Sequence, residues 1–322
     1  MQAARPLQEW LTDDATPVKL KQRLALAQDM RHFAVTELQL PDNPSYQTYA
    51  DLQRRSAVWN VVAAPEFSLT LKTWCFPVAG CVGYRGYFAE TDAQAMANAL
   101  REQGFEVSVY GVPAYSTLGW SNWVGGDPLL NTFIHNTEGD LARLLFHEMA
   151  HQVVYVSDDT TFNESFATAV ERLGGKRWLE WRTPAVPDDA QQNRQRQQFR
   201  ALTRATRQKL QQIYSQNEAL VHSQHAQKAI KTEAMMQFKA NYAELKKSWG
   251  GYSGFDTWVA QANNASFGAL AAYDELVPGF EALFAQHEHN WLRFYAAVKQ
   301  LANRPQAQRT QFLIDLGKMQ HG

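Results

Sequence analysis

Two histidines separated by three residues carry the strongest chemical signal in this chain. They are His147 and His151, with Glu148 directly after the first of them. On a helix, residues four apart lie one above the other on one face, so the two imidazoles can bind a single metal ion. Glu148 then lies beside that ion as a general base. The pattern predicts a hydrolytic zinc site in which both histidines are ligands.

The third metal ligand is less clear from the residues alone. A catalytic zinc ion takes three protein ligands and keeps one position open for water. Glu164 lies far enough beyond His151 for a tight turn to bring a second helix alongside the first. However, Thr161-x-x-Glu164 is also a capping-box pattern, so Glu164 is equally explained as a helix cap. Glu171, two turns further on, is a competing ligand on nearly the same face.

The elements that must position these residues begin with short strands. Apolar and aromatic runs are broken by proline and glycine, which is typical of strands in a small mixed sheet. The predicted strands are Val58–Ala63, Leu69–Phe76, Val82–Phe88 and Val107–Tyr115. One helix, Asp92–Gln103, is expected between the last two, with Thr91 as its N-cap.

Helices are expected both before and after this sheet. Residues 18–38 have helical spacing of apolar residues. Thr137 opens the helix that carries the histidines, and a second helix, Phe162–Leu173, should end at Gly174-Gly175. Two long helices follow, 188–217 (mostly exposed) and 218–247, and further helices broken at Pro278 and Pro305 run to about residue 318.

This order predicts an α+β, zincin-like fold. A small mixed sheet precedes the metal-motif helix, and the C-terminal part is mostly helical. We expect three parts: an N-terminal helical segment (1–57), a catalytic core (58–183) and a helical region that completes the cleft (184–322).

The composition excludes several classes of protein. The 322 residues are 45% hydrophobic and 12% aromatic with a formal net charge of −1, which is typical of a globular protein and not of a nucleic-acid-binding one. No apolar run is long enough for a transmembrane helix. The first residues do not resemble a signal peptide. Cys75 and Cys81 are the two cysteines, and they are equally compatible with free thiols or with a disulfide formed in an oxidising compartment.

Several segments resemble known zinc peptidases. Asn163–Ala167 (NESFA) followed by Glu171 resembles the N-E-G-F-A…E segment of gluzincin aminopeptidases. The wider resemblance is to a bacterial family of predicted aminopeptidases, many of them lipoproteins, and covers roughly residues 55–285. It rests on Trp74–Phe88, Gly111–Trp120, Asp127–Ile134, the HEMAHQ segment, Thr160–Glu171, Asn263–Ala265 and Leu276–Pro278.

This resemblance assigns roles to individual residues. It makes Glu164 the third zinc ligand and places Glu171 behind a histidine ligand, where it orients the ring. Gluzincins commonly offer a tyrosine or histidine to the reaction's oxyanion, and Tyr273 is the first candidate here, ahead of Tyr115 and Tyr252. Zincins also bind substrate along an edge strand before the metal helix. At that position this chain has Tyr115, Ser116 and Thr117, although an ordinary core strand explains them equally well.

One family feature is missing from this sequence. Gluzincin aminopeptidases carry a G-x-M-E-N strand whose glutamate binds the free amine of the substrate, and this chain has no such motif. Another acid, such as Asp127 or Glu90, must bind the amine, or the enzyme is an endopeptidase.

The sequence therefore predicts a zinc-dependent peptidase with one Zn²⁺ per chain. The resemblance implies an aminopeptidase of the bacterial cell envelope or periplasm, with a lipid anchor in the full-length precursor. The alternatives are an endopeptidase with the same site and a non-catalytic zinc-binding scaffold of the envelope. The scaffold would bind a protein partner on the polar helices of 188–247. No nucleic-acid partner is expected.

Overall fold

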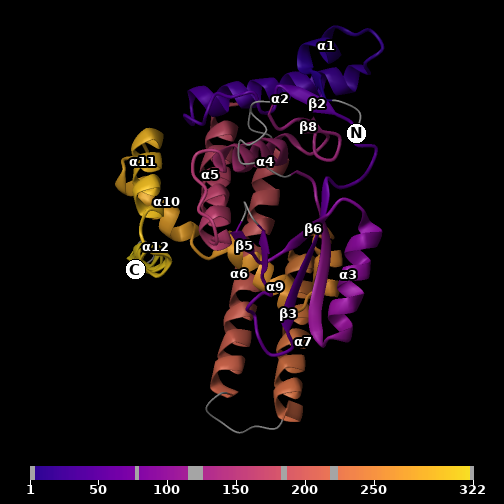
Figure 1. Ribbon diagram of the computed structural model, residues 1–322, viewed down its shortest axis with the longest axis vertical. Helices are drawn as coiled ribbons and strands as arrows, with labels where there is room; N and C mark the ends of the chain where they lie inside the picture. Colours follow the sequence, from indigo (N-terminus) through magenta and orange to yellow (C-terminus); the bar gives the residue numbers. More distant parts are fainter. Residues whose placement is uncertain (1–3, 77–79, 115–125, 183–186, 218–223, 320–322) are drawn as a thin grey trace.

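A computed structural model describes residues 4–76, 80–114, 126–182, 187–217 and 224–319 (Figure 1). The fold is α+β, as predicted, with small sheets of two or three strands and a mostly helical C-terminal part. The strands form three small sheets rather than one continuous sheet.

A long helix, α2 (Val18–Thr36), crosses one end of the molecule (Figure 1). The short helix α1 (Leu7–Thr12) precedes it. Next to them, β2 (Thr48–Ala50) pairs antiparallel with β1 (Arg5–Pro6) and parallel with β8 (Leu129–Leu130). This pairing attaches the N-terminal segment to the chain that leads into the metal-motif helix.

A second sheet is antiparallel and has β3 (Val58–Pro65) at its centre. Its edges are β6 (Arg85–Tyr87) and β7 (Phe105–Val112). Because side chains alternate along a strand, the sheet has two faces. Helix α3 (Glu90–Glu102) covers one face, and α9 (Asn264–Asp274) packs against the other. Each face buries its own apolar cluster: Val61, Ala63 and Val107 on the α3 side, and Val62 and Ala64 on the α9 side.

Two strand predictions are corrected by a disulfide-bonded hairpin. The predicted strand Leu69–Phe76 is reduced to β4 (Trp74–Phe76), and Val82–Phe88 divides into β5 (Gly80–Val82) and β6. The reason is that β4 and β5 pair with each other, with Cys75 opposite Cys81, and these two cysteines form a disulfide. Of the two cysteine states that the sequence allows, the structure has the bonded one.

The predicted N-cap of α3 is also wrong. The helix begins at Glu90, one residue before Thr91, and Ala89 occupies the cap position without a side-chain hydrogen bond. Two acidic residues in the first turn, Glu90 and Asp92, interact favourably with the helix dipole instead.

The motif helix α4 (Glu138–Ala150) and helix α5 (Thr160–Trp181) pack closely against each other. The prediction that α5 ends at Gly174-Gly175 is wrong, because both glycines lie inside the helix at its contacts with neighbours. A Cβ atom on Gly174 would lie 2.7 Å from the Leu38 side chain, and one on Gly175 would lie 2.7 Å from Arg143 Cγ. These glycines therefore permit close helix packing and do not end the helix.

Helices α6 (Pro187–Asn217) and α7 (Gln224–Ser248) run side by side and extend away from the body (Figure 1). The prediction of a mostly exposed first helix is corrected by one buried face. That face and α7 share an aromatic cluster that includes Phe199, Tyr214, Phe238 and Tyr242.

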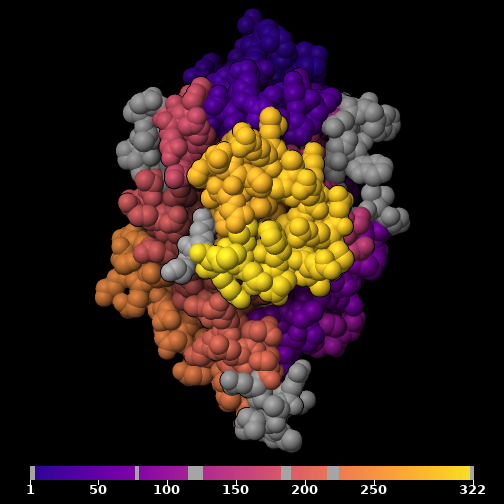
Figure 2. Space-filling view, turned by 90° about the vertical axis from the view of Figure 1, so that its left-hand side faces the viewer, coloured from indigo at the N-terminus to yellow at the C-terminus, as the bar shows by residue number. Residues whose placement is uncertain are grey.

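Helix α8 (Asp256–Gln261) adds Val259 to the cluster that α6 and α7 share. Helices α10 (Val277–Gln286), α11 (Trp291–Ala302) and α12 (Gln306–Met319) complete the main core. As predicted, the chain breaks near Pro278, which lies in the first turn of α10, and at Pro305, which precedes α12. In Figure 2 the yellow C-terminal residues gather on one face and adjoin the indigo N-terminal segment. Tyr295 of α11 donates a hydrogen bond to the backbone oxygen of Leu38, 2.8 Å away, across this junction.

Within the described residues, no helix combines the length and the apolar character that crossing a membrane requires.

Candidate metal centre

Helix α4 carries the two histidines at its C-terminal end, where their side chains are buried. Its N-cap is Thr137, as predicted, whose side chain accepts a hydrogen bond from the backbone of Asp140. At the other end, His147 and Glu148 lie in the last turn and His151 is the C-cap residue. All three side chains are buried. Burial of three ionisable groups in one helical turn is costly unless they interact with each other or with a ligand.

The turn after α4 determines where α5 begins. Asp159 is the N-cap of α5: its Oδ1 accepts a hydrogen bond from the backbone of Phe162 at 3.0 Å. Its Oδ2 accepts a hydrogen bond from Arg309 Nε of α12 at 2.7 Å. Asn163 fixes the turn further, because its side chain bonds both the N–H and the C=O of Val156. Thr161 is therefore inside the helix, and the capping-box explanation of Glu164 is wrong.

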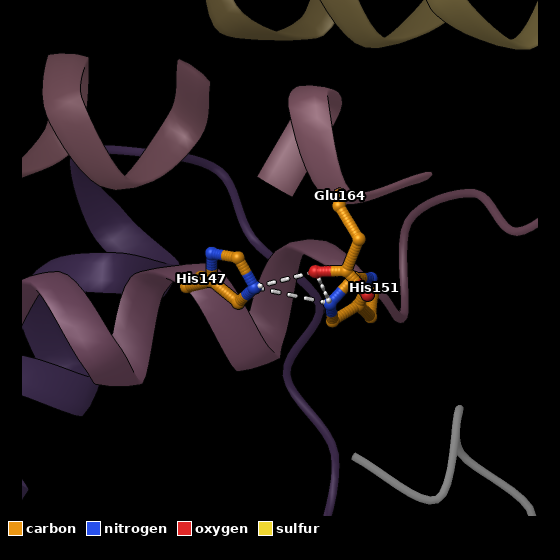
Figure 3. Close-up of side chains that lie close together, drawn as sticks. All are labelled: His147, His151 and Glu164. Atoms are coloured by element: carbon orange, nitrogen blue, oxygen red, sulfur yellow. Dashed lines mark hydrogen bonds and ion pairs between the residues drawn. The ribbon is translucent and has the colours of Figure 1, made fainter. Parts of the chain in front are cut away.

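Glu164 instead points toward the histidines (Figure 3). Its Oε2 lies 3.3 Å from His147 Nε2 and 3.7 Å from His151 Nε2, and the two Nε2 atoms are 3.2 Å apart. Four tetrahedral ligands, each about 2.0–2.1 Å from a zinc ion, are separated from one another by about 3.3 Å. The three side chains therefore form a group with the spacing that a tetrahedral metal ion needs.

A fourth side chain, Glu171, supports one of the histidines. Its Oε2 lies 3.2 Å from His147 Nδ1, on the side of the ring away from Glu164. A carboxylate at this position fixes the orientation and tautomer of a metal-binding imidazole. Glu164 therefore lies on the Nε2 side of the His147 ring and Glu171 on the Nδ1 side, and the roles of ligand and supporting residue stay predictions. The Nδ1 atom of His151 has no such partner among the residues described.

Tyr273 lies over the same group. Its ring is stacked on that of His147, with centroids 6.2 Å apart, and its hydroxyl is close enough to Glu164 to lower the pKa of that carboxylate. Ser165 places this tyrosine, since its hydroxyl donates to the backbone oxygen of Ala272 at 3.0 Å and accepts from the N–H of Leu276 at 3.2 Å. Three consecutive residues of α5 thus have different contacts: Asn163 bonds to the turn before the helix, Glu164 contacts the histidines, and Ser165 bonds to the end of α9, which carries Tyr273, and to the backbone just beyond it.

Burial and close charges shift the pKa values of the group in different directions. Burial alone would lower the pKa of His147, but hydrogen bonds to Glu164 and Glu171 raise it above the ordinary value. Burial lowers the pKa of His151 to about 4. For Glu164, burial is opposed by the two histidines and Tyr273, which together lower its pKa. Metal binding requires neutral histidines and a charged carboxylate. The low pKa values of His151 and Glu164 meet that requirement, whereas His147 must release a proton when a metal ion binds.

Glu148 differs from the other carboxylates. Burial raises the pKa of Glu148 to about 7, with His147 opposing the shift and Glu164 adding to it. A carboxylate with a pKa near neutrality can both accept and return a proton, which is the property that a general base and acid needs.

A pocket of about 360 Å³ opens over this group. One side of it is formed by His147, Glu148, His151, Glu164 and Tyr273. The other nine lining residues form the sheet side: Val58, Asn60, Tyr84, Gly86, Tyr87, Phe88, Val112 and Ala114 come from the antiparallel sheet and the chain next to it, and Tyr155 comes from the turn after α4. The pocket has room for a short stretch of peptide next to the metal group.

Other predicted positions lie elsewhere or are not described. Tyr115, Ser116 and Thr117 are outside the described residues, so their substrate contacts stay a prediction. Of the two acids considered for binding a substrate amine, Asp127 is buried and Glu90 is exposed, and neither lines the pocket. Tyr252 lies beside Trp249, away from the metal group.

The sheet side of the pocket was not anticipated from the sequence. Tyr84, Gly86 and Phe88 alternate along one strand and its flanks, a period-2 pattern that points alternate residues to the same face. Tyr155 lies four residues after His151, so helical spacing places it near the motif. Both signals are present in the sequence, but they do not show which element faces the metal group.

Comparison with known families gives one match. The model of the family described as "Putative aminopeptidase" matches residues 1–313, so this chain belongs to that family. Comparison with curated proteins and with solved structures gives no match.

Proposed function

We propose that this member of the aminopeptidase family is a zinc-dependent metallopeptidase that removes N-terminal residues from peptides. The observation that carries the proposal is the spacing of the three ligand atoms, 3.2, 3.3 and 3.7 Å apart. This spacing fits a tetrahedral ion, and two nitrogens with one carboxylate oxygen form a ligand set used by catalytic zinc. The family membership supports peptides as substrates.

In this proposal the residues around the metal group have different roles. His147, His151 and Glu164 hold the metal ion, and Glu171 holds His147 from behind. When bound, zinc supplies a Lewis acid that polarises a carbonyl and lowers the pKa of water. Glu148 accepts a proton from the attacking water and donates it to the amine of the leaving group.

Tyr273 is proposed to donate a hydrogen bond to the oxyanion that forms in the reaction. Its ring is stacked on that of His147 and it lines the same pocket as Glu148 and Glu164, so it lies next to the proposed reacting centre. A donor fixed at this point stabilises negative charge as it develops on the carbonyl oxygen of the substrate.

The proposal also states where the peptide is cut, namely after an N-terminal residue. Among the described residues that line the pocket, the only acids are Glu148 and Glu164, both of which already have tasks. An endopeptidase with the same site is therefore the main alternative, because it needs no acid for a free amine.

Matched peptides with free and acetylated N-termini test the proposal. We expect cleavage of the free peptide, loss of cleavage on acetylation, inactivation by a chelator and recovery with one equivalent of zinc per chain. Equal cleavage of both peptides would identify an endopeptidase. Absence of any chelator-sensitive cleavage would favour the zinc-binding scaffold, with the α6–α7 pair as its surface for a protein partner.

The cell envelope or periplasm is the proposed location. A disulfide between Cys75 and Cys81 is consistent with an oxidising compartment. Fractionation of cells that express the full-length gene, with lipid labelling, tests both the location and the lipid anchor that the family resemblance implies.

A further inference from the structure

We infer that the sheet side of the pocket selects peptides with a large apolar or aromatic side chain next to the bond that is cut. This inference rests on the proposed peptidase function and adds the class of substrate. It also assigns to Phe88 a role in selecting that side chain.

The first observation is the chemical contrast inside the pocket. Its acidic and basic residues, Glu148, Glu164 and the two histidines, lie on the helical side. The other nine lining residues include no carboxylate, lysine, arginine or histidine. A charged substrate side chain placed against these nine residues would lose water without gaining an ion pair from them, which is unfavourable. Burial of an apolar side chain against the same surface is favourable, because it removes apolar surface from water.

The second observation concerns the shape of the sheet side around Gly86. Val58 lies opposite Val112, and Asn60 lies opposite Gly86, so these four residues share the face that looks onto the pocket. A Cβ atom on Gly86 would lie 2.9 Å from Val58 Cγ1 and 3.4 Å from Asn60 Oδ1. A side chain at this position would therefore press on its neighbours and narrow the space. With glycine here, the pocket wall is backbone at this point, and Val58 and Asn60 keep their positions.

The third observation concerns the mouth of the pocket. Phe88 lines the pocket although 60% of its surface is exposed. Arg54 holds it there, because its guanidinium lies 5.6 Å from the centre of the ring and donates a hydrogen bond to the backbone oxygen of Phe88 at 3.0 Å. An exposed phenylalanine is not unusual by itself. Its place at the rim gives it a surface that a bound apolar side chain would cover.

Two matched series of peptides test this inference. Each series varies one position as Phe, Leu, Ala, Asp or Lys, either directly before or directly after the bond that is cut. In one of the two series we expect kcat/KM for Phe or Leu to exceed that for Asp or Lys at least about tenfold. Equal values in both series, or a preference for a charged residue, would overturn the inference while leaving the peptidase intact. Absence of all cleavage in both series would overturn the proposed function, and the inference with it.

Phe88→Ala makes the test specific to the rim. We expect kcat/KM for the Phe peptide to fall about tenfold, with the Ala peptide changed less than about twofold, and Phe88→Leu to recover most of the loss. Because Phe88 is largely exposed, the variant should fold, and unchanged cleavage of the Ala peptide shows that it has. The matched control is Leu292→Ala, which removes an equally exposed apolar side chain from α11, outside the pocket. An equal loss for all peptides in Phe88→Ala would contradict a role in selection.

Discussion

The two sides of the pocket are built by different means. On the helical side, buried ionisable groups from two helices hold one another: Glu171 contacts His147 Nδ1, and Glu164 contacts His147 Nε2. On the sheet side, the surface is uncharged and is set by strand register and by the missing side chain of Gly86. The helical side holds the groups that the proposed reaction uses, and the sheet side determines the shape of the pocket.

This difference predicts two kinds of mutational effect. Changes on the helical side should reduce metal binding or turnover for every substrate, because the proposed function places the groups there at the reacting atoms. Changes on the sheet side should alter the ranking of substrates and leave metal binding unchanged.

The largest effect is expected from Glu148→Gln. The amide keeps the size of the side chain but cannot accept the proton of the attacking water. We expect kcat to fall by about 10²–10⁴-fold for all peptides. The metal content, measured by atomic emission on the purified protein, should stay at one ion per chain.

The variant to compare with Glu148→Gln is Phe88→Ala, on the sheet side. Phe88→Ala should keep kcat for small substrates, whereas Glu148→Gln should lose it for every substrate. If Glu148→Gln retained full activity, Glu148 would not be the base. If it lost the metal as well, the residue would belong to the ligand set.

The contrast between the two sides also explains what the sequence predicted well. His147 and His151 are four residues apart, so helical periodicity alone determines that these two share a face, with Glu148 beside them. The choice of Glu164 over Glu171 required the resemblance to gluzincins, because a capping box explained Glu164 equally well. The structure removes the capping explanation, because Asp159 takes the cap position and Glu164 faces the histidines, but its role as a ligand stays a prediction.

Features that depend on distant contacts were not predictable in this way. Gly174-Gly175 has the composition of a helix end, yet Leu38, Phe146 and Arg143 pack so closely there that only glycine fits. The sheet side of the pocket brings together residues from three strands, and their register is fixed by pairing across the sheet. A single sequence contains the residues of such a surface but not their alignment.

A second, smaller effect is expected from Arg309→Met. Arg309 and Asp159 form an ion pair in which both side chains are buried, 7% and 2% exposed, and Asp159 also caps the helix that carries Glu164. Removing the arginine leaves a buried carboxylate without its charged partner. We expect the free energy of unfolding, measured by urea denaturation, to fall by about 3–5 kcal/mol.

Two further variants separate this pair from a general effect of losing an arginine. Arg293→Met breaks an exposed ion pair with Glu288 and should cost less than about 1 kcal/mol. Adding Asp159→Asn to Arg309→Met removes the unpaired charge but keeps an oxygen for the cap, so part of the stability should return. Equal stability of the Arg309 and Arg293 variants would contradict the role of the buried pair.

The smallest of the three effects is expected from Glu171→Gln, because this residue touches a metal-holding side chain rather than the metal. The amide is a weaker acceptor for His147 Nδ1, 3.2 Å away, so the ring should be held less firmly and be less basic. We expect the zinc affinity, measured by competition with a chelating dye, to fall about 10–100-fold. Glu180→Gln, an exposed position on the same helix, is the matched control and should leave the affinity unchanged. Phe88→Ala should also bind zinc as the parent protein does. Weaker zinc binding in Phe88→Ala would show that the two sides of the pocket are coupled, and that the division between chemistry and shape does not hold.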